Sequence, residues 1–163
     1  MLSTIIRGMS AGLAGAAVMT AVEKLEQAFT GRPNSYVPAR TLAHLAGLPR
    51  PDEDRLGRNW LMHYGTGATV GVLRGAMARA NVRGPAASFM HTWIRLATDQ
   101  TLENGTGVGA PPATWPRSEL VIDVAHKAIY SFATGVFADA LIEPRPTSSV
   151  RRPAQRLRLP GFA

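Results

Sequence analysis

The sequence predicts an all-α fold, a four-helix transmembrane bundle rich in glycine and alanine. Three features support this prediction: four long stretches without acidic or basic side chains, glycines that recur every four residues, and aromatic residues near the ends of the stretches. The chain has 163 residues, which fits one domain, because two cores would each form from about 80 residues or fewer. We expect a helical membrane domain at 1–143 with a polar loop at 30–58, and a basic disordered tail at 144–163.

The uncharged stretches set the number of expected spans. Four stretches without Asp, Glu, Lys or Arg fall within helix-like sequence: residues 8–22, 59–73, 84–94 and 128–138. A helix needs about 20 mostly apolar residues to cross roughly 30 Å of hydrocarbon. The first two stretches reach that length if Arg7 and Arg74 extend their charged ends to the interface. The last two require charged side chains to lie near helix ends or to face the bundle interior, namely Arg95, Asp99 and Asp123.

Glycine and proline mark the expected helix ends. Gly31 and Pro33 end the first helix, and Gly47 ends a short helix within the polar loop. Gly84 and Pro85 separate the second long helix from the third, with Pro85 in the first turn of the latter. The expected helices are residues 1–29, 39–46, 53 or 59 to 80, 85–102 and 118–142.

Five glycines are candidates for close helix packing. Gly67, Gly71 and Gly75 lie four residues apart on one helical face, and Gly8 and Gly12 repeat this spacing in the first helix. In water each interior glycine costs a helix about 1 kcal/mol relative to alanine. In a bilayer, small residues at this spacing let two backbones approach closely. We therefore predict that this face packs against the first helix or against a second copy of the chain.

Two alternatives to the membrane prediction stay open. A soluble bundle rich in glycine and alanine would contain similar segments, and the mean hydropathy of the chain is close to zero. Arg7 followed by an apolar run and small residues also has the outline of a cleaved signal sequence. Trp60, Tyr64 and Trp115 favour the bilayer, because they lie next to predicted spans, where interfacial aromatic residues are enriched.

The chain is strongly basic and lacks cysteine. Its 18 Lys and Arg against 11 Asp and Glu give a formal net charge of +7, which points to an anionic partner. Without cysteine, disulfides, thiolate metal sites and thiol catalysis are excluded.

The basic tail has its own predicted partner. We expect four of its arginines to lie against anionic lipid headgroups: Arg151, Arg152, Arg156 and Arg158. We expect no nucleic-acid binding, because Phe162 is the tail's only aromatic residue for stacking on bases. The alternative is a solvated tail that only satisfies the positive-inside rule.

No recognised catalytic motif is present. The glycines at 65–71 lack the spacing of a dinucleotide-binding fingerprint, and HExxH, GxSxG and EF-hand patterns do not occur. An enzymatic activity is therefore not the leading expectation.

The histidines are the best candidates for chemistry. His63, His91 and His126 each lie on a different predicted helix, and Asp123 shares a helix face with His126. The other carboxylates of the candidate cluster also come in pairs about one turn apart, Glu23 with Glu26 and Asp99 with Glu103. If they converge, imidazole and carboxylate could bind a divalent metal or relay protons. The alternative is that these polar groups lie at helix ends, solvated or paired with cations, namely Arg74, Arg95 and Lys127.

Two segments carry a resemblance to known membrane proteins. They are Arg32-Pro33-Asn34-Ser35 and residues 115–138, the latter with Glu119, Leu120, His126, Tyr130 and Gly135. They resemble small integral membrane proteins of high-GC bacteria and, more faintly, YagU-type inner-membrane proteins. The similarity spans residues 5–142 as four helices rich in glycine and alanine with a polar first loop. It implies a four-span protein without an established catalytic site, although Glu23 and Glu26 depart from the pattern.

Together these features predict an integral membrane protein that acts through helix packing, or through assembly with a second copy or another membrane protein. A membrane-embedded metal or proton-relay site is the second hypothesis, and a soluble helical-bundle enzyme is the third. No cofactor is predicted apart from the divalent metal of the second hypothesis. Under four spans, Arg7, Arg74, Arg79 and Arg83 share one side, which places both termini on the cytoplasmic side of the inner (plasma) membrane.

Overall fold

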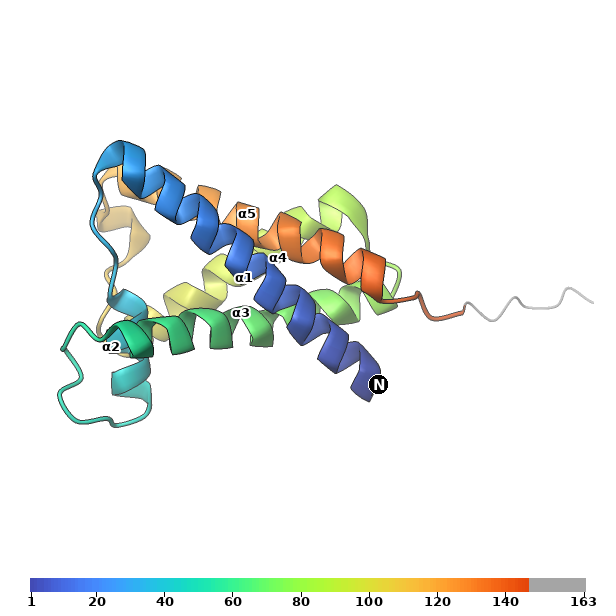
Figure 1. Ribbon diagram of the computed structural model, residues 1–163, viewed down its shortest axis with the longest axis horizontal. Helices are drawn as coiled ribbons and strands as arrows, with labels where there is room; N and C mark the ends of the chain where they lie inside the picture. Colours follow the sequence, from blue (N-terminus) through green and yellow to red (C-terminus); the bar gives the residue numbers. More distant parts are fainter. Residues whose placement is uncertain (147–163) are drawn as a thin grey trace, which may run out of the picture.

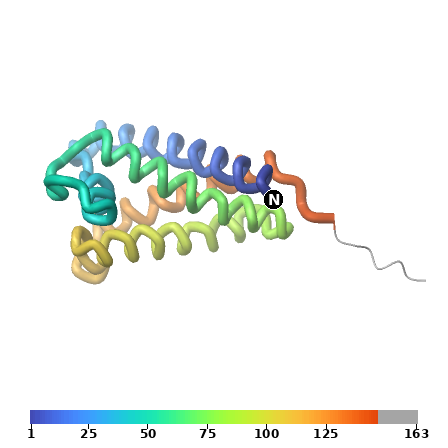
Figure 2. Tube along the Cα trace, turned by 90° about the horizontal axis from the view of Figure 1, so that it is seen from below, coloured from blue at the N-terminus to red at the C-terminus, as the bar shows by residue number. Residues whose placement is uncertain are grey.

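The computed structural model describes residues 1–146, and these fold entirely as helices and connecting segments. The elements are α1 (Leu2–Thr30), α2 (Val37–Leu45), α3 (Leu56–Arg79), α4 (Gly84–Gly105), a 3-10 turn η1 (Pro112–Thr114) and α5 (Arg117–Leu141). The four long helices form an elongated bundle with α2 at one end (Figures 1 and 2). The N-terminus and the end of α5 lie at the opposite end. The all-α prediction is confirmed, and the predicted helix ends agree with these bounds to within one turn.

Two glycines in left-handed conformation set helix ends. Gly31, with φ of 70°, ends α1, and its N–H donates to the Gln27 carbonyl. Gly84, with φ of 74°, begins α4, and Pro85 follows in the first turn. Glycine suits both positions because a Cβ atom disfavours positive φ.

Glycine backbones form the contact between α1 and α3. Gly8 and Gly12 of α1 lie against Gly67, Gly71 and Gly75 of α3. A Cβ atom added at Gly71 would lie 2.5 Å from the Gly12 Cα and 2.6 Å from the Gly8 carbonyl oxygen. The two backbones are thus too close for a side chain between them. Packing against α1 is one of the two arrangements that the glycine spacing suggests.

Helix α5 connects α4 to the rest of the bundle. Gly15 of α1 faces Tyr130 and Thr134 of α5, and Gly135 of α5 faces Ser88 of α4. Helix α4 packs mainly against α5 and much less against α3. The position of α4 therefore depends on α5.

Small and polar side chains fill the bundle, and large apolar side chains cover it. Most of its buried hydrophobic residues are alanines, and Arg74, His91, Arg95 and Asp99 are buried with them. Large exposed hydrophobic side chains occur on all four long helices, including Ile6, Leu13, Trp60, Leu73, Phe89, Trp93, Phe132 and Val136. Large apolar side chains are therefore exposed on every long helix, while much of the interior is formed by small and polar side chains.

Two of the described helices, α1 and α5, are long and apolar enough to cross a membrane. The core helix of a soluble protein and a signal sequence meet the same criterion. Helices α3 and α4 have the length but do not meet the criterion. Length and composition alone therefore support two spans, and the four-span arrangement needs a further argument.

Candidate functional site

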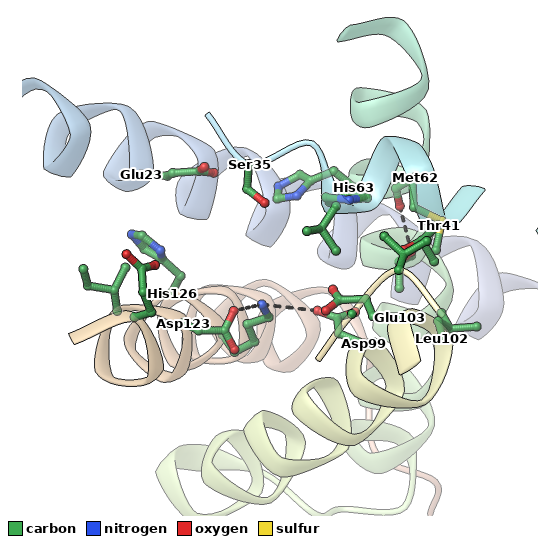
Figure 3. A pocket seen from close by; sticks show the side chains of 18 of the residues that line it. Glu23, Ser35, Thr41, Met62, His63, Asp99, Leu102, Glu103, Asp123 and His126 are labelled. Atoms are coloured by element: carbon green, nitrogen blue, oxygen red, sulfur yellow. Dashed lines mark hydrogen bonds and ion pairs between the residues drawn. The ribbon is translucent and has the colours of Figure 1, made fainter. Parts of the chain in front are cut away.

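A cavity of about 480 Å³ opens at the end of the bundle that carries α2. Because neighbouring helices run in opposite directions, this end receives the last turns of α1 and α4 and the first turns of α3 and α5. Figure 3 shows side chains from these helices around the opening, among them Glu23, His63, Glu103 and His126. The volume is typical of sites that bind small molecules.

A network of ion pairs crosses one wall of the cavity. The Arg95 Nε donates to Asp99 Oδ2 at 3.0 Å, and the Lys127 Nζ lies 3.6 Å from the same oxygen. Lys127 also donates to Asp123, one turn earlier on α5. The two buried cations of this wall are therefore neutralised by carboxylates of α4 and α5.

Tyr130 organises the polar residues beneath this wall. The Arg95 guanidinium lies 4.8 Å from the Tyr130 ring centroid, and the His91 ring stacks on Tyr130 at 5.6 Å. The Tyr130 hydroxyl donates to the Gly67 carbonyl at 2.6 Å, and the His91 Nε2 donates to the Val70 carbonyl at 3.1 Å. The packing of α5 and α4 against α3 thus includes hydrogen bonds to the Gly67 and Val70 carbonyls.

The structure sets His91 apart from the other three residues of the predicted metal site. His63, His126 and Asp123 line the cavity, whereas His91 is buried elsewhere in the bundle. His63 contacts the Thr20 hydroxyl at 3.1 Å, and Asp123 is paired with Lys127. Within residues 1–146, no three or more His, Asp or Glu side chains are grouped to hold a metal ion.

We expect protein purified in detergent to contain substoichiometric zinc and iron when measured by inductively coupled plasma mass spectrometry. The reason is that the Asp123 carboxylate is already paired with Lys127, and the His91 Nε2 already donates to the Val70 carbonyl. Stoichiometric metal that disappears in the His126→Ala variant would instead favour the metal-site hypothesis.

Three carboxylates that line the cavity have no cationic partner among the described residues. They are Glu23 of α1, Glu103 of α4 and Glu119 of α5. Glu23 accepts one hydrogen bond from the Gln27 side chain at 3.2 Å. Arg32 lies nearby but is bound to Glu26 at 2.8 Å, and this hydrogen bond raises the pKa of the Arg32 guanidinium.

Sequence reasoning missed part of this cavity. It did not single out Thr41 and named Glu119 only within the resemblance, although both line the cavity. A usable signal exists, because in an up-and-down bundle the polar residues near 23, 63, 99 and 123 must fall at one end.

A second buried ion pair lies at the opposite end of the bundle. Arg74 is fully buried, and its Nη2 donates to Asp139 Oδ2 at 2.9 Å. Arg7 donates to the Leu141 carbonyl, and Arg83 donates to the Asp139 and Ile142 carbonyls. These arginines complement the negative end of the α5 helix dipole. The four arginines predicted to contact lipid headgroups, Arg151, Arg152, Arg156 and Arg158, lie outside the described residues.

Comparison of the chain with protein-family models, with curated proteins and with solved structures finds no match. The resemblance to YagU-type proteins therefore stays a prediction. A functional proposal has to rest on the cavity and on the surface of the bundle.

Proposed function

We propose that the chain is an inner-membrane protein in which α1, α3, α4 and α5 all span the bilayer, and that its cavity binds a small polar solute from the aqueous side. The observation that carries this proposal is a cavity lined by charged side chains at one end of a bundle with an apolar exterior. A soluble protein with the same interior would expose its large apolar side chains to water. In this proposal the close helix packing predicted from the sequence serves as the scaffold of the cavity.

The exposure of the helices supports spanning. Only 33% of the most apolar window of α1 and 22% of that of α5 is buried, whereas a core helix of a soluble protein is mostly buried. Helices α3 and α4 have 24 and 22 residues, enough to cross about 30 Å at roughly 1.5 Å per residue. Their buried charges are paired: Arg74 with Asp139, and Arg95 with Asp99. Pairing inside the bundle is the usual state of charged groups at membrane depth.

The arginine distribution supports an orientation with both termini in the cytoplasm. Arg7, Arg79, Arg83 and Arg145 lie at the end of the bundle that carries the N-terminus and the end of α5, and positive residues are enriched on the cytoplasmic side. The polar loop also carries arginines, which oppose this orientation. In the proposed orientation the cavity opens away from the cytoplasm.

Thiol labelling in the membrane tests the proposal. Because the chain has no cysteine, each introduced thiol is unique. Thr66 lines the cavity, whereas Thr69, one turn along α3, is exposed on the outside of the bundle. Both hydroxyls donate to a carbonyl one turn earlier, so the two positions are matched. We expect Thr66→Cys to react with a small charged methanethiosulfonate reagent and Thr69→Cys, facing lipid, to be protected.

The same experiment can contradict the proposal. In a soluble bundle the exposed Thr69→Cys would react faster than Thr66→Cys, and the protein would leave the membrane fraction after a carbonate wash. A third variant, Ala80→Cys, reports on the end that carries the N-terminus and the end of α5, where Ala80 is exposed. In intact cells it should react only after permeabilisation.

Assembly with a second copy or another membrane protein is the second candidate function. Phe89 and Trp93 pack edge to face at 6.0 Å on the outer surface of α4, and Met90 lies beside them in sequence. All three side chains are more than half exposed. This surface favours a partner helix within the membrane, because contact there would not disturb the cavity.

A further inference from the structure

We propose that the cavity selects a small organic cation: an amine on an apolar stem that also carries a hydroxyl or carbonyl oxygen. This inference rests on the proposed function, because it assumes a cavity that takes up a solute from water. It adds the charge and the shape of that solute.

The charge follows from the pairing of the lining residues. Each cation of the lining already has its own carboxylate: Arg32 has Glu26, Arg95 has Asp99, and Lys127 has Asp123. Three carboxylates then remain without a cation among the described residues, namely Glu23, Glu103 and Glu119. They come from three different helices and border one cavity. Glu23 and Glu103 are partly buried, and Glu119 is exposed. Partly buried carboxylates interact more strongly with an opposite charge than exposed ones do, so the lining favours a cationic ligand over an anionic one.

Two buried polar groups add a second requirement. Thr41 is fully buried and Arg95 is 3% exposed, and both line the cavity. The Thr41 Oγ1 and the Arg95 Nη1 have no hydrogen-bond partner among the described residues. Buried polar atoms normally have one. Because the Arg95 Nη1 can only donate, the complementary ligand atom is an oxygen acceptor.

Much of the remaining lining is apolar, although Ser35, Asn59, His63, Thr66 and His126 add polar groups. Met19, Met62, Leu102 and Ile122 contribute to the wall between these polar groups. A hydrated inorganic ion would leave these side chains in contact with water. A hydrocarbon stem would cover them and gain about 0.8 kcal/mol per buried methylene.

Four probes of equal chain length separate the requirements. Aminopentanol has the amine and the oxygen, pentylamine lacks the oxygen, pentanediol lacks the charge, and hydroxypentanoate carries the opposite charge. Affinity is measured on the full chain in detergent, from the dependence of the unfolding temperature on probe concentration. We expect aminopentanol to bind most tightly, pentylamine more weakly, and pentanediol and hydroxypentanoate at least about tenfold more weakly than aminopentanol.

Variants assign the contacts. Glu103→Gln and Glu119→Gln should each weaken aminopentanol binding by about tenfold, the size of one charge-assisted interaction. Thr41→Val should weaken the binding of aminopentanol, which carries the oxygen, but leave the binding of pentylamine unchanged. Glu53→Gln is the matched control, because Glu53 is a loop residue paired with Arg50 and Arg55 and does not line the cavity. Each variant is compared with its own unfolding temperature without probe, so a loss of stability is not counted as a loss of binding.

Two results would overturn the inference. Pentanediol binding as tightly as aminopentanol would remove the requirement for charge. Magnesium chloride giving the same stabilisation, with the same loss in Glu103→Gln and Glu119→Gln, would assign the carboxylates to a metal ion. If Thr66→Cys is labelled but the cavity does not prefer the amine probes, only this inference fails. If Thr66→Cys is not labelled, the proposed function fails first.

Discussion

Gly71→Ala should separate α1 from α3 and destabilise the bundle by about 3 kcal/mol, the upper range for added volume in a packed interface. The added methyl group would meet the backbone of Gly8 and Gly12 at 2.5 to 2.8 Å. Backbone atoms of two long helices cannot move aside as a flexible side chain can. The free energy of unfolding, measured by titration with sodium dodecyl sulfate in mixed micelles, reports the change.

Gly65→Ala is the matched control for this prediction. Gly65 lies on the same helix, and a Cβ atom added there has no neighbour within 4 Å. The substitution should be neutral or slightly stabilising, because alanine favours the helix. Equal destabilisation by the two variants would show that the α1 and α3 backbones are not in contact.

Removal of the Asp139 carboxylate should destabilise the bundle by about 3 to 5 kcal/mol, because it leaves the Arg74 charge buried and unpaired. Arg74 is fully buried, and Asp139 also accepts the Gly84 N–H at 2.9 Å. Asp139→Ala therefore removes both the counter-charge of Arg74 in α3 and the hydrogen-bond acceptor of the Gly84 N–H at the start of α4. The sodium dodecyl sulfate titration measures this loss as well.

A double variant separates charge from packing. Arg74→Met in the Asp139→Ala background removes the unpaired charge, so it should recover much of the lost stability. Asp54→Ala is the control, since its ion pair with Arg40 is exposed, and the change should stay within about 1 kcal/mol. Failure of Arg74→Met to restore stability would assign the effect of Asp139 to its contact with Gly84.

The sequence allows the helices to be predicted because their ends depend on local chemistry. Gly31 adopts a left-handed conformation directly after α1, and Gly84 with Pro85 opens α4. Such signals are read from a few neighbouring residues. The same is true of the pairs Arg95–Asp99 and Asp123–Lys127, which are one helical turn apart.

The cavity and the Arg74–Asp139 pair depend on the tertiary arrangement. Arg74 and Asp139 are separated by 65 positions, and no local pattern links them. The lining of the cavity combines Thr41 from α2 with Glu103 and Glu119 from α4 and α5. Only the direction of each helix and its rotation about its own axis bring these side chains together. The number of spans also stays a proposal. Composition counts the charged residues of α3 and α4 but does not tell whether they face the bundle interior or the surroundings.

The placement of the ion pairs has a consequence for biosynthesis. In a chain that enters the bilayer helix by helix, α4 brings Asp99 with Arg95, and α5 brings Asp123 with Lys127. Each of these two pairs can therefore form within its own helix before the helices pack together. Arg74 has no such partner on α3, and its counter-charge, Asp139, is translated near the end of α5. In the proposed four-span arrangement, the Arg74 guanidinium would stay near the interface until α5 has been made, so the last helix to be synthesised would complete the insertion of an earlier one.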